Sequence, residues 1–149
     1  MAFRMPIPSI EKSTASEIKS FQEKKLKELL SYTLSHSTYY KNLFKANGLD
    51  ANSIHIIEDL VKVPVTTKDD LYKFNKDFIC VSPNKIIDYV TTSGTLGDPL
   101  TFALTNNDLE RLAYNENISL ACSGATSDDV FQLMTTLDRR FMAGLAYFL

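Results

Sequence analysis

The sequence of 149 residues lacks several features that would place it in a specialised class of protein. It has no tryptophan and only two cysteines, Cys80 and Cys122, which have neither a close-spaced partner nor a nearby histidine. This argues against a disulfide scaffold and a zinc site, so we expect no metal ligands. No apolar run approaches the roughly 20 residues of a membrane-spanning helix, and the opening residues lack the apolar core of a signal peptide. We therefore expect a cytoplasmic protein without a membrane partner.

Neither sign of charge dominates the chain, since 16 Lys and Arg residues face 18 Asp and Glu residues, for a net charge of -2. The lysines from Lys12 to Lys45 are interleaved with glutamates and apolar residues, as on a solvated helix surface. A nucleic-acid-binding protein would show a basic patch instead. We therefore expect no nucleic-acid partner.

The first half of the chain has helical periodicity. Apolar residues from Ser16 to Ser35 fall close to helical spacing and charged residues fill the other face, which predicts an amphipathic helix. A shorter pattern follows, with Ser37 available as its N-terminal cap and Gly48 as its left-handed stop. This predicts a second helix over 37–48.

Two further helices are predicted by the same local signal, a threonine followed three residues later by an aspartate. Thr67 with Asp70 and Thr105 with Asp108 both fit a capping box, in which the two side chains satisfy each other's backbone N–H groups. First-turn acids also interact favourably with the helix dipole. These aspartates therefore have a structural explanation that requires no catalytic role.

Beyond Pro83 the sequence becomes typical of extended structure. The stretches KIIDYVTT (85–92) and PLTFALT (99–105) predict two strands joined by SGTLGD. DDVFQLMTT (128–136) is interpreted as a buried strand, and DRRFMAGLAYFL (138–149) as the start of an apolar helix. The fold class is thus α/β, with N-terminal helices followed by a β-hairpin and a β-α-β segment.

We divide this chain into a helical N-terminal region, residues 1–85, and the start of an α/β subdomain, residues 86–149. The last apolar run stops at Leu149 without Gly, Pro or a polar cap. Such an ending leaves carbonyls and an apolar face without partners. We therefore interpret the two regions as one incomplete domain of a larger protein.

The loop between the two predicted strands has the chemistry to hold a polyphosphate. Its glycines allow crowded backbone angles, its amides can point into one concavity, and its hydroxyls can donate hydrogen bonds worth about 1.5–3 kcal/mol each to a charged oxygen. The standard nucleotide fingerprints are absent, however, and Asp98 adds a negative charge. Composition alone leaves two interpretations open, a plain hairpin turn and a phosphate loop.

The stretch TTSGTLGDP (91–99) resembles the Ser/Thr-Ser-Gly-Thr-Thr-Gly-x-Pro phosphate loop of the adenylate-forming superfamily, which includes acyl-CoA synthetases. Three more blocks are similar in order and spacing to the opening of phenylacetate-CoA ligases: LKELLSYTLSHSTYYKNLFKANGLD, IIEDLVKVPVTTKDDLYKF and FALTNNDLERL. The resemblance runs from about Leu26 to Leu149. It implies that the chain is a fragment of the large N-terminal domain of an adenylate-forming enzyme.

The resemblance implies a reaction and a site. The expected enzyme activates a small aryl or acyl carboxylic acid with ATP and Mg²⁺ and then forms a thioester with coenzyme A. Leu96 stands where a second threonine is usual, and Leu100 where many members have a lysine. The family's other functional motifs lie downstream of Leu149, so no catalytic residue is assigned and the chain alone is expected to be inactive. The expected phosphate contacts are Thr92, Ser93, Gly94, Thr95 and Gly97.

Other interpretations stay open. The chain could be a non-catalytic binding or oligomerisation module that exposes Phe141–Leu149, as in a homo-oligomer. The parent could also be an acyl-protein synthetase or an adenylating enzyme that does not use coenzyme A. Of two pairs of residues near the end, the first could form an anion site near the acyl pocket or surface ion pairs, and the second could line the acyl pocket or pack in the core. These pairs are Arg139 with Arg140 and Tyr147 with Phe148.

Overall fold

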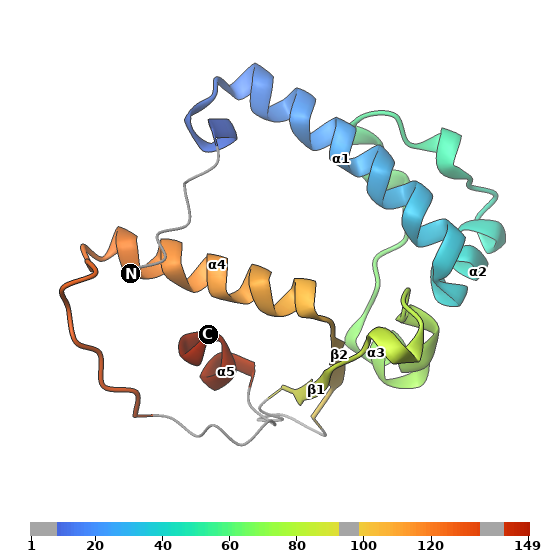
Figure 1. The fold of residues 1–149 in the computed structure, drawn as a ribbon. Coiled ribbons are helices and arrows are strands. Elements are labelled where there is room, and N and C mark those ends of the chain that lie inside the picture. The colour runs from blue at the N-terminus through green and yellow to red at the C-terminus, as the bar shows by residue number, and fades with distance from the viewer. Residues whose placement is uncertain (1–8, 93–98, 135–141) are drawn as a thin grey trace. The chain divides into compact units, whose positions relative to one another are not determined.

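The computed structural model describes residues 9–92, 99–134 and 142–149. The described residues form two compact units that divide between Val81 and Ser82 (Figure 1). We call residues 9–81 the helical unit, and the described residues from 82 onward the hairpin unit. None of the described helices combines the length and the apolar character needed to cross a bilayer.

The helical unit consists of three α-helices and four short 3-10 helices within its described residues: η1 (Ser9–Lys12), α1 (Ala15–His36), α2 (Thr38–Ala46), η2 (Ala51–Ser53), η3 (Ile57–Lys62), α3 (Lys68–Lys73) and η4 (Asn75–Phe78). The described part of the hairpin unit adds η5 (Pro83–Lys85), β1 (Asp88–Thr91), β2 (Thr101–Leu104), α4 (Asn106–Cys122) and α5 (Met142–Phe148). The predicted fold class, helices followed by a hairpin in an α/β arrangement, is confirmed at this level.

Helix α1 confirms the predicted amphipathic helix and adds a cap that the sequence analysis missed. The Thr14 side chain accepts a hydrogen bond from the N–H of Glu17 (3.4 Å), and the Glu17 carboxylate accepts one from the N–H of Thr14 (2.8 Å). The two hydrogen bonds that the Glu17 carboxylate accepts, from the N–H and from the hydroxyl of Thr14, lower the pKa of Glu17 because they favour its charged form. The helix therefore begins with a complete capping box.

Ser37 connects α1, α2 and η4. Its side chain is fully buried and caps α2 by accepting a hydrogen bond from the N–H of Tyr40 (3.2 Å), as predicted. The same hydroxyl donates to the carbonyl oxygen of Asp77 (2.8 Å), 40 residues away in the sequence. Gly48 follows α2 with φ = 65°, which confirms the predicted left-handed stop.

The apolar core of the helical unit lies where α1 meets α2 and the chain that follows them. Leu30, Phe44 and Ile54 are its buried centre, at 9%, 3% and 1% exposure. Leu26, Leu30 and Leu34 repeat every four residues along α1, which places them on one face. The residues packed around the centre are Leu26, Leu34, Leu49 and Val63.

A cluster of aromatic rings joins α2 to the segment α3–η4. Tyr39 is buried and stacks on Phe78, with ring centroids 4.0 Å apart, and also lies against Phe74 at 5.7 Å. Tyr40 meets Phe78 edge-on at 5.6 Å. Burial raises the pKa of Tyr39 because it disfavours the charged phenolate. The ring cluster thus holds the end of the helical unit onto α2.

The capping boxes predicted for α3 and α4 are both present. The Asp70 carboxylate accepts from the N–H of Thr67 (2.8 Å), and the Asp108 carboxylate accepts from the N–H of Thr105 (2.9 Å). Hydrogen bonds from Thr67 lower the pKa of Asp70. Both aspartates therefore have the structural role that the sequence indicated.

The strand predicted over 128–136 is wrong for residues 128–134. These residues are not part of a sheet, and Val130, Phe131 and Met134 are exposed at 97%, 60% and 85%. A strand needs a neighbour to satisfy its backbone N–H and C=O groups. No such neighbour lies within the described part of the chain, so this segment forms no strand there despite its strand-like sequence.

Helix α5 packs against α4 (Figure 1), with Ala146 buried at 5% exposure. The interpretation of Tyr147 and Phe148 as core residues is wrong, because they are exposed at 56% and 67%. A seven-residue helix that packs along one side leaves the side chains of its other face uncovered. Arg139 and Arg140 lie outside the described residues.

Candidate nucleotide-binding hairpin

The hairpin of β1 and β2 fixes which residues face each other at the base of the loop. The strands are antiparallel, with Asp88 opposite Leu104, Val90 opposite Phe102, and Thr91 opposite Thr101. β-branched and aromatic residues in both strands suit this pairing. The ladder therefore ends at Thr91 and Thr101, and the next residues on each side begin the loop.

The loop is closed by two hydrogen bonds between Thr92 and Leu100. The N–H of Thr92 donates to the carbonyl oxygen of Leu100 (2.9 Å). The N–H of Leu100 donates in return to the side-chain oxygen of Thr92 (3.0 Å). The two ends of the loop are thus held together beyond the last residues of the strands.

Buried apolar side chains anchor this stem to the hairpin unit. Val90 has no exposed surface, while Leu100 and Leu104 are exposed at only 5% and 7%. Successive strand residues point to opposite faces and paired residues share a face, so Val90, which pairs with Phe102, lies on the same face as Leu104. The base of the loop is therefore held by buried side chains of both strands.

Of the five expected phosphate contacts, one lies within the described residues and four lie outside them. Thr92 is described, and it is the residue that closes the loop. The other four, Ser93, Gly94, Thr95 and Gly97, lie outside the described residues. Leu100, noted in the sequence only for replacing a lysine, turns out to be the partner of Thr92. The sequence carried no signal for that pairing.

The described hairpin brings little charge to its loop. Asp88 is the one charged residue among 86–92 and 99–105, and it lies opposite Leu104, at the end of the ladder away from the loop. Helix α4 starts just after Leu104, so its N-terminal amides lie at that same end, where Asp108 already caps them. Positive charge for a polyphosphate must therefore come from outside these residues. Among the described residues, no group of three or more His, Cys, Asp or Glu side chains could hold a metal ion.

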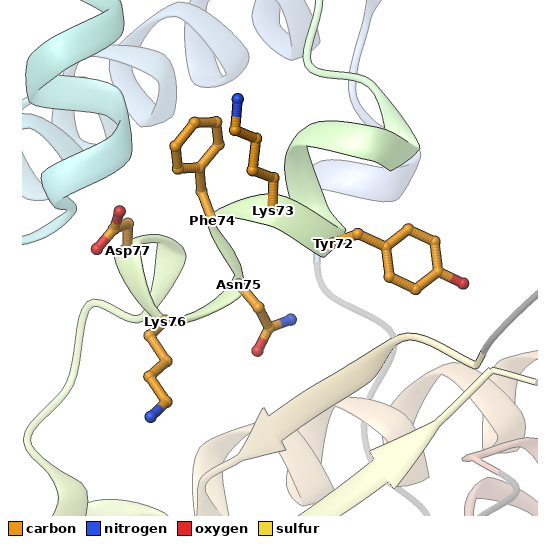
Figure 2. A pocket seen from close by; sticks show the side chains of 6 residues that line it. All are labelled: Tyr72, Lys73, Phe74, Asn75, Lys76 and Asp77. Carbon is orange, nitrogen blue, oxygen red and sulfur yellow. The ribbon is translucent and has the colours of Figure 1, made fainter.

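A shallow hollow of about 330 Å³ is lined by the consecutive residues Tyr72–Asp77 of α3 and η4 (Figure 2). Figure 2 shows Lys73 and Phe74 on one side of this turn and Asn75 and Lys76 on the other. The ammonium group of Lys73 lies 5.2 Å from the centre of the Phe74 ring. All residues that line the hollow are consecutive in one turn, and no side chain from another described element converges on it. The hairpin therefore remains the candidate site.

Comparison with curated proteins found several phenylacetate-coenzyme A ligases among the relatives of this chain. The chain is 31% identical over 121 residues to the phenylacetate-coenzyme A ligase of Thermus thermophilus, an overlap of 79% of this chain and 27% of that protein. It is 30% identical over 123 residues to the Escherichia coli enzyme of the same name, covering 80% and 28% of the two chains. The chain belongs to the phenylacetate-coenzyme A ligase-like branch of the adenylate-forming enzymes. No model of a protein family matches it.

Solved structures agree with membership of this branch at the level of the fold. A crystal structure of 2-hydroxyisobutyryl-CoA ligase with 2-HIB-AMP and CoA matches with a TM-score of 0.66 at 24% identity. The match covers 74% of this chain and 26% of that one. The fold is therefore that of part of the N-terminal domain of an adenylate-forming enzyme. The chain spans about 27–31% of the length of the phenylacetate-coenzyme A ligases that it matches.

Proposed function

We propose that the chain supplies the phosphate-holding hairpin of an ATP-dependent carboxylate-CoA ligase. The observation that carries the proposal is a hairpin closed at Thr92 and Leu100, on buried anchors, in a chain of this family. A preorganised loop stabilises transferring phosphoryl groups by placing its donors before the substrate arrives. The reaction proposed for the whole protein is formation of an acyl-adenylate and pyrophosphate, followed by transfer of the acyl group to coenzyme A.

The described residues suit one part of that task. A threonine hydroxyl that accepts a hydrogen bond keeps its own proton, so Thr92 can still donate to an anionic oxygen. The described hairpin offers no cation, so Mg²⁺ and groups elsewhere in the enzyme would neutralise the triphosphate. Because the groups that would neutralise the triphosphate lie elsewhere in the enzyme, we expect no adenylation by the chain alone.

The substrate class follows from the relatives and is part of the proposal. Four of the curated relatives are named for phenylacetate, and the structural neighbour for 2-hydroxyisobutyrate. We therefore propose a small aryl or acyl carboxylic acid. Cytoplasmic residence is proposed with it.

Carboxylate-dependent exchange of radiolabelled pyrophosphate into ATP tests the proposed reaction. The assay uses the protein that carries this chain, Mg²⁺, and separate tubes with phenylacetate, 2-hydroxyisobutyrate and no acid. We expect exchange with at least one acid and none in the tube without acid. Absence of exchange with a wider panel of aryl and acyl acids, in a folded protein, would refute the ligase proposal.

A second function, an oligomerisation module, is favoured by exposed apolar side chains in the hairpin unit. Phe131 and Met134 are exposed at 60% and 85%, and Tyr147, Phe148 and Leu149 at 56%, 67% and 47%. Light scattering over a range of concentrations tests it. Association that Phe131→Ser abolishes, and that the helical-unit control Leu29→Ser does not, would support this function; a monomer at every concentration would exclude it.

A further inference from the structure

The hydrogen-bond ladder of the hairpin changes character at Thr92. In a regular antiparallel pair, two opposite residues exchange N–H to C=O bonds in both directions. Thr92 and Leu100 make the first of these bonds in the usual way, from the N–H of Thr92 to the carbonyl of Leu100 (2.9 Å). The return bond goes from the N–H of Leu100 to the Thr92 side-chain oxygen (3.0 Å).

Because the N–H of Leu100 donates to the Thr92 side chain instead of to a backbone carbonyl, the hydroxyl of Thr92 is needed to pair this N–H. Leu100 is buried at 5% exposure, so an unpaired N–H at this position would be costly. Valine has nearly the shape of threonine but cannot accept a hydrogen bond, whereas serine can. The pair of substitutions therefore separates the hydroxyl from the bulk of the side chain.

We propose that Thr92 is a positioning residue, whose hydroxyl holds the Leu100 amide and thereby fixes the spacing of the two ends of the loop. This inference rests on the proposed function in one respect, because the loop that it positions is taken to bind phosphate. Holding the ends of a loop reduces the conformational freedom that binding must otherwise remove. Thr92 then contributes to binding through Leu100, whether or not it also touches the phosphate.

The experiment compares Thr92→Val and Thr92→Ser, with Thr105→Val as the matched control. Hydrogen exchange is measured in the 149-residue chain, and ligand binding is measured in the protein that carries this chain. Thr105 caps α4 at the other end of β2, so its substitution removes a threonine hydroxyl bond without touching the Leu100 amide. Amide hydrogen exchange by NMR reports Leu100, with Phe102 as the reference in the same strand. Titration with Mg·ATP and with Mg·pyrophosphate reports phosphate binding, and circular dichroism confirms that each variant is folded.

In Thr92→Val we expect the Leu100 amide to exchange roughly two- to thirteen-fold faster relative to Phe102, the range that the loss of one ordinary hydrogen bond gives. The affinity of Thr92→Val for Mg·ATP should also fall. In Thr92→Ser and Thr105→Val, the Leu100 exchange rate and the affinity for Mg·ATP should both stay near those of the unmodified protein. Unchanged Leu100 exchange in Thr92→Val would overturn the inference, as would faster exchange with unchanged affinity.

Failure of the proposed function gives a different result. If the unmodified protein that carries this chain binds neither Mg·ATP nor Mg·pyrophosphate, the phosphate role of the loop and of Thr92 is overturned. Leu100 exchange in Thr92→Val then still decides whether the hydroxyl holds the stem, because that measurement needs no ligand.

Discussion

Replacing Ser37 with alanine should weaken the junction of α1, α2 and η4 more than any exposed serine substitution does. The hydroxyl has no exposed surface and makes two bonds, accepting from the N–H of Tyr40 (3.2 Å) and donating to the carbonyl of Asp77 (2.8 Å). Alanine removes both bonds and leaves two backbone groups without these partners.

The expected loss follows from these two bonds. Replacing an N-terminal cap with alanine costs about 1 kcal/mol, and leaving a buried acceptor unpaired costs about 1–3 kcal/mol. Because the Asp77 region is only half-buried and can relax, we expect a total of about 2–3 kcal/mol in the free energy of unfolding. For a unit of this size, each kcal/mol lowers the melting temperature by about 4–8 °C.

Urea denaturation followed by circular dichroism at 222 nm measures this loss, and the absence of tryptophan makes that signal preferable to intrinsic fluorescence. Ser35→Ala is the control, because its exposed hydroxyl bonds only back to the carbonyl of Ser31 (2.7 Å). That variant should stay within about 0.5 kcal/mol of the unmodified chain. A loss below 1 kcal/mol for Ser37→Ala, or equal losses for the two variants, would refute the reasoning.

Two further substitutions test the helical unit. Phe44→Ala, in the core at 3% exposure, should lower the free energy of unfolding measured in urea by about 3–5 kcal/mol. The control Leu29→Ala, at 58% exposure, should lower it by less than about 1 kcal/mol. Similar losses for the two variants would contradict the assigned core. The hydrogen bond from Lys62, with two backbone N–H bonds, holds the pKa of Asp59 well below its ordinary value of 3.8. Its contribution to stability is therefore present above that value and lost as the pH falls through the lowered pKa of the folded state. Melting temperatures from pH 7 to pH 2 should fall less steeply below pH 4 for Asp59→Asn, and an unchanged profile would count against this linkage.

Local signals in the sequence predicted where α3 and α4 begin, although the same kind of signal at the start of α1 was missed. Thr67 with Asp70 and Thr105 with Asp108 are complete within four residues, so they need no tertiary information. Ser37 shows where such signals end. Its cap on α2 was predicted from the neighbouring residues, but its bond to Asp77 spans 40 positions and depends on how the unit folds.

In the segment 128–134, by contrast, the sequence predicted a strand that the structure does not contain. Its apolar and β-branched residues are those of a strand, yet Val130 is 97% exposed and the segment belongs to no sheet. Strand formation depends on a partner, and sequence pattern does not supply one. Leu100 illustrates the same limit at the candidate site, because its role depends on a side-chain oxygen across the loop.

The central claim, that the hairpin of this chain holds phosphate, is tested most directly by NMR titration of the protein that carries this chain, ¹⁵N-labelled in residues 1–149, with Mg·ATP, Mg·pyrophosphate and AMP. A loop that binds the β- and γ-phosphates should respond to the first two, with shifts of the Thr92 and Leu100 amides, and respond little to AMP. The helical-unit control, the amide of Phe44, should stay unchanged. Equal shifts with AMP, or none with ATP and pyrophosphate at millimolar concentration, would contradict the claim.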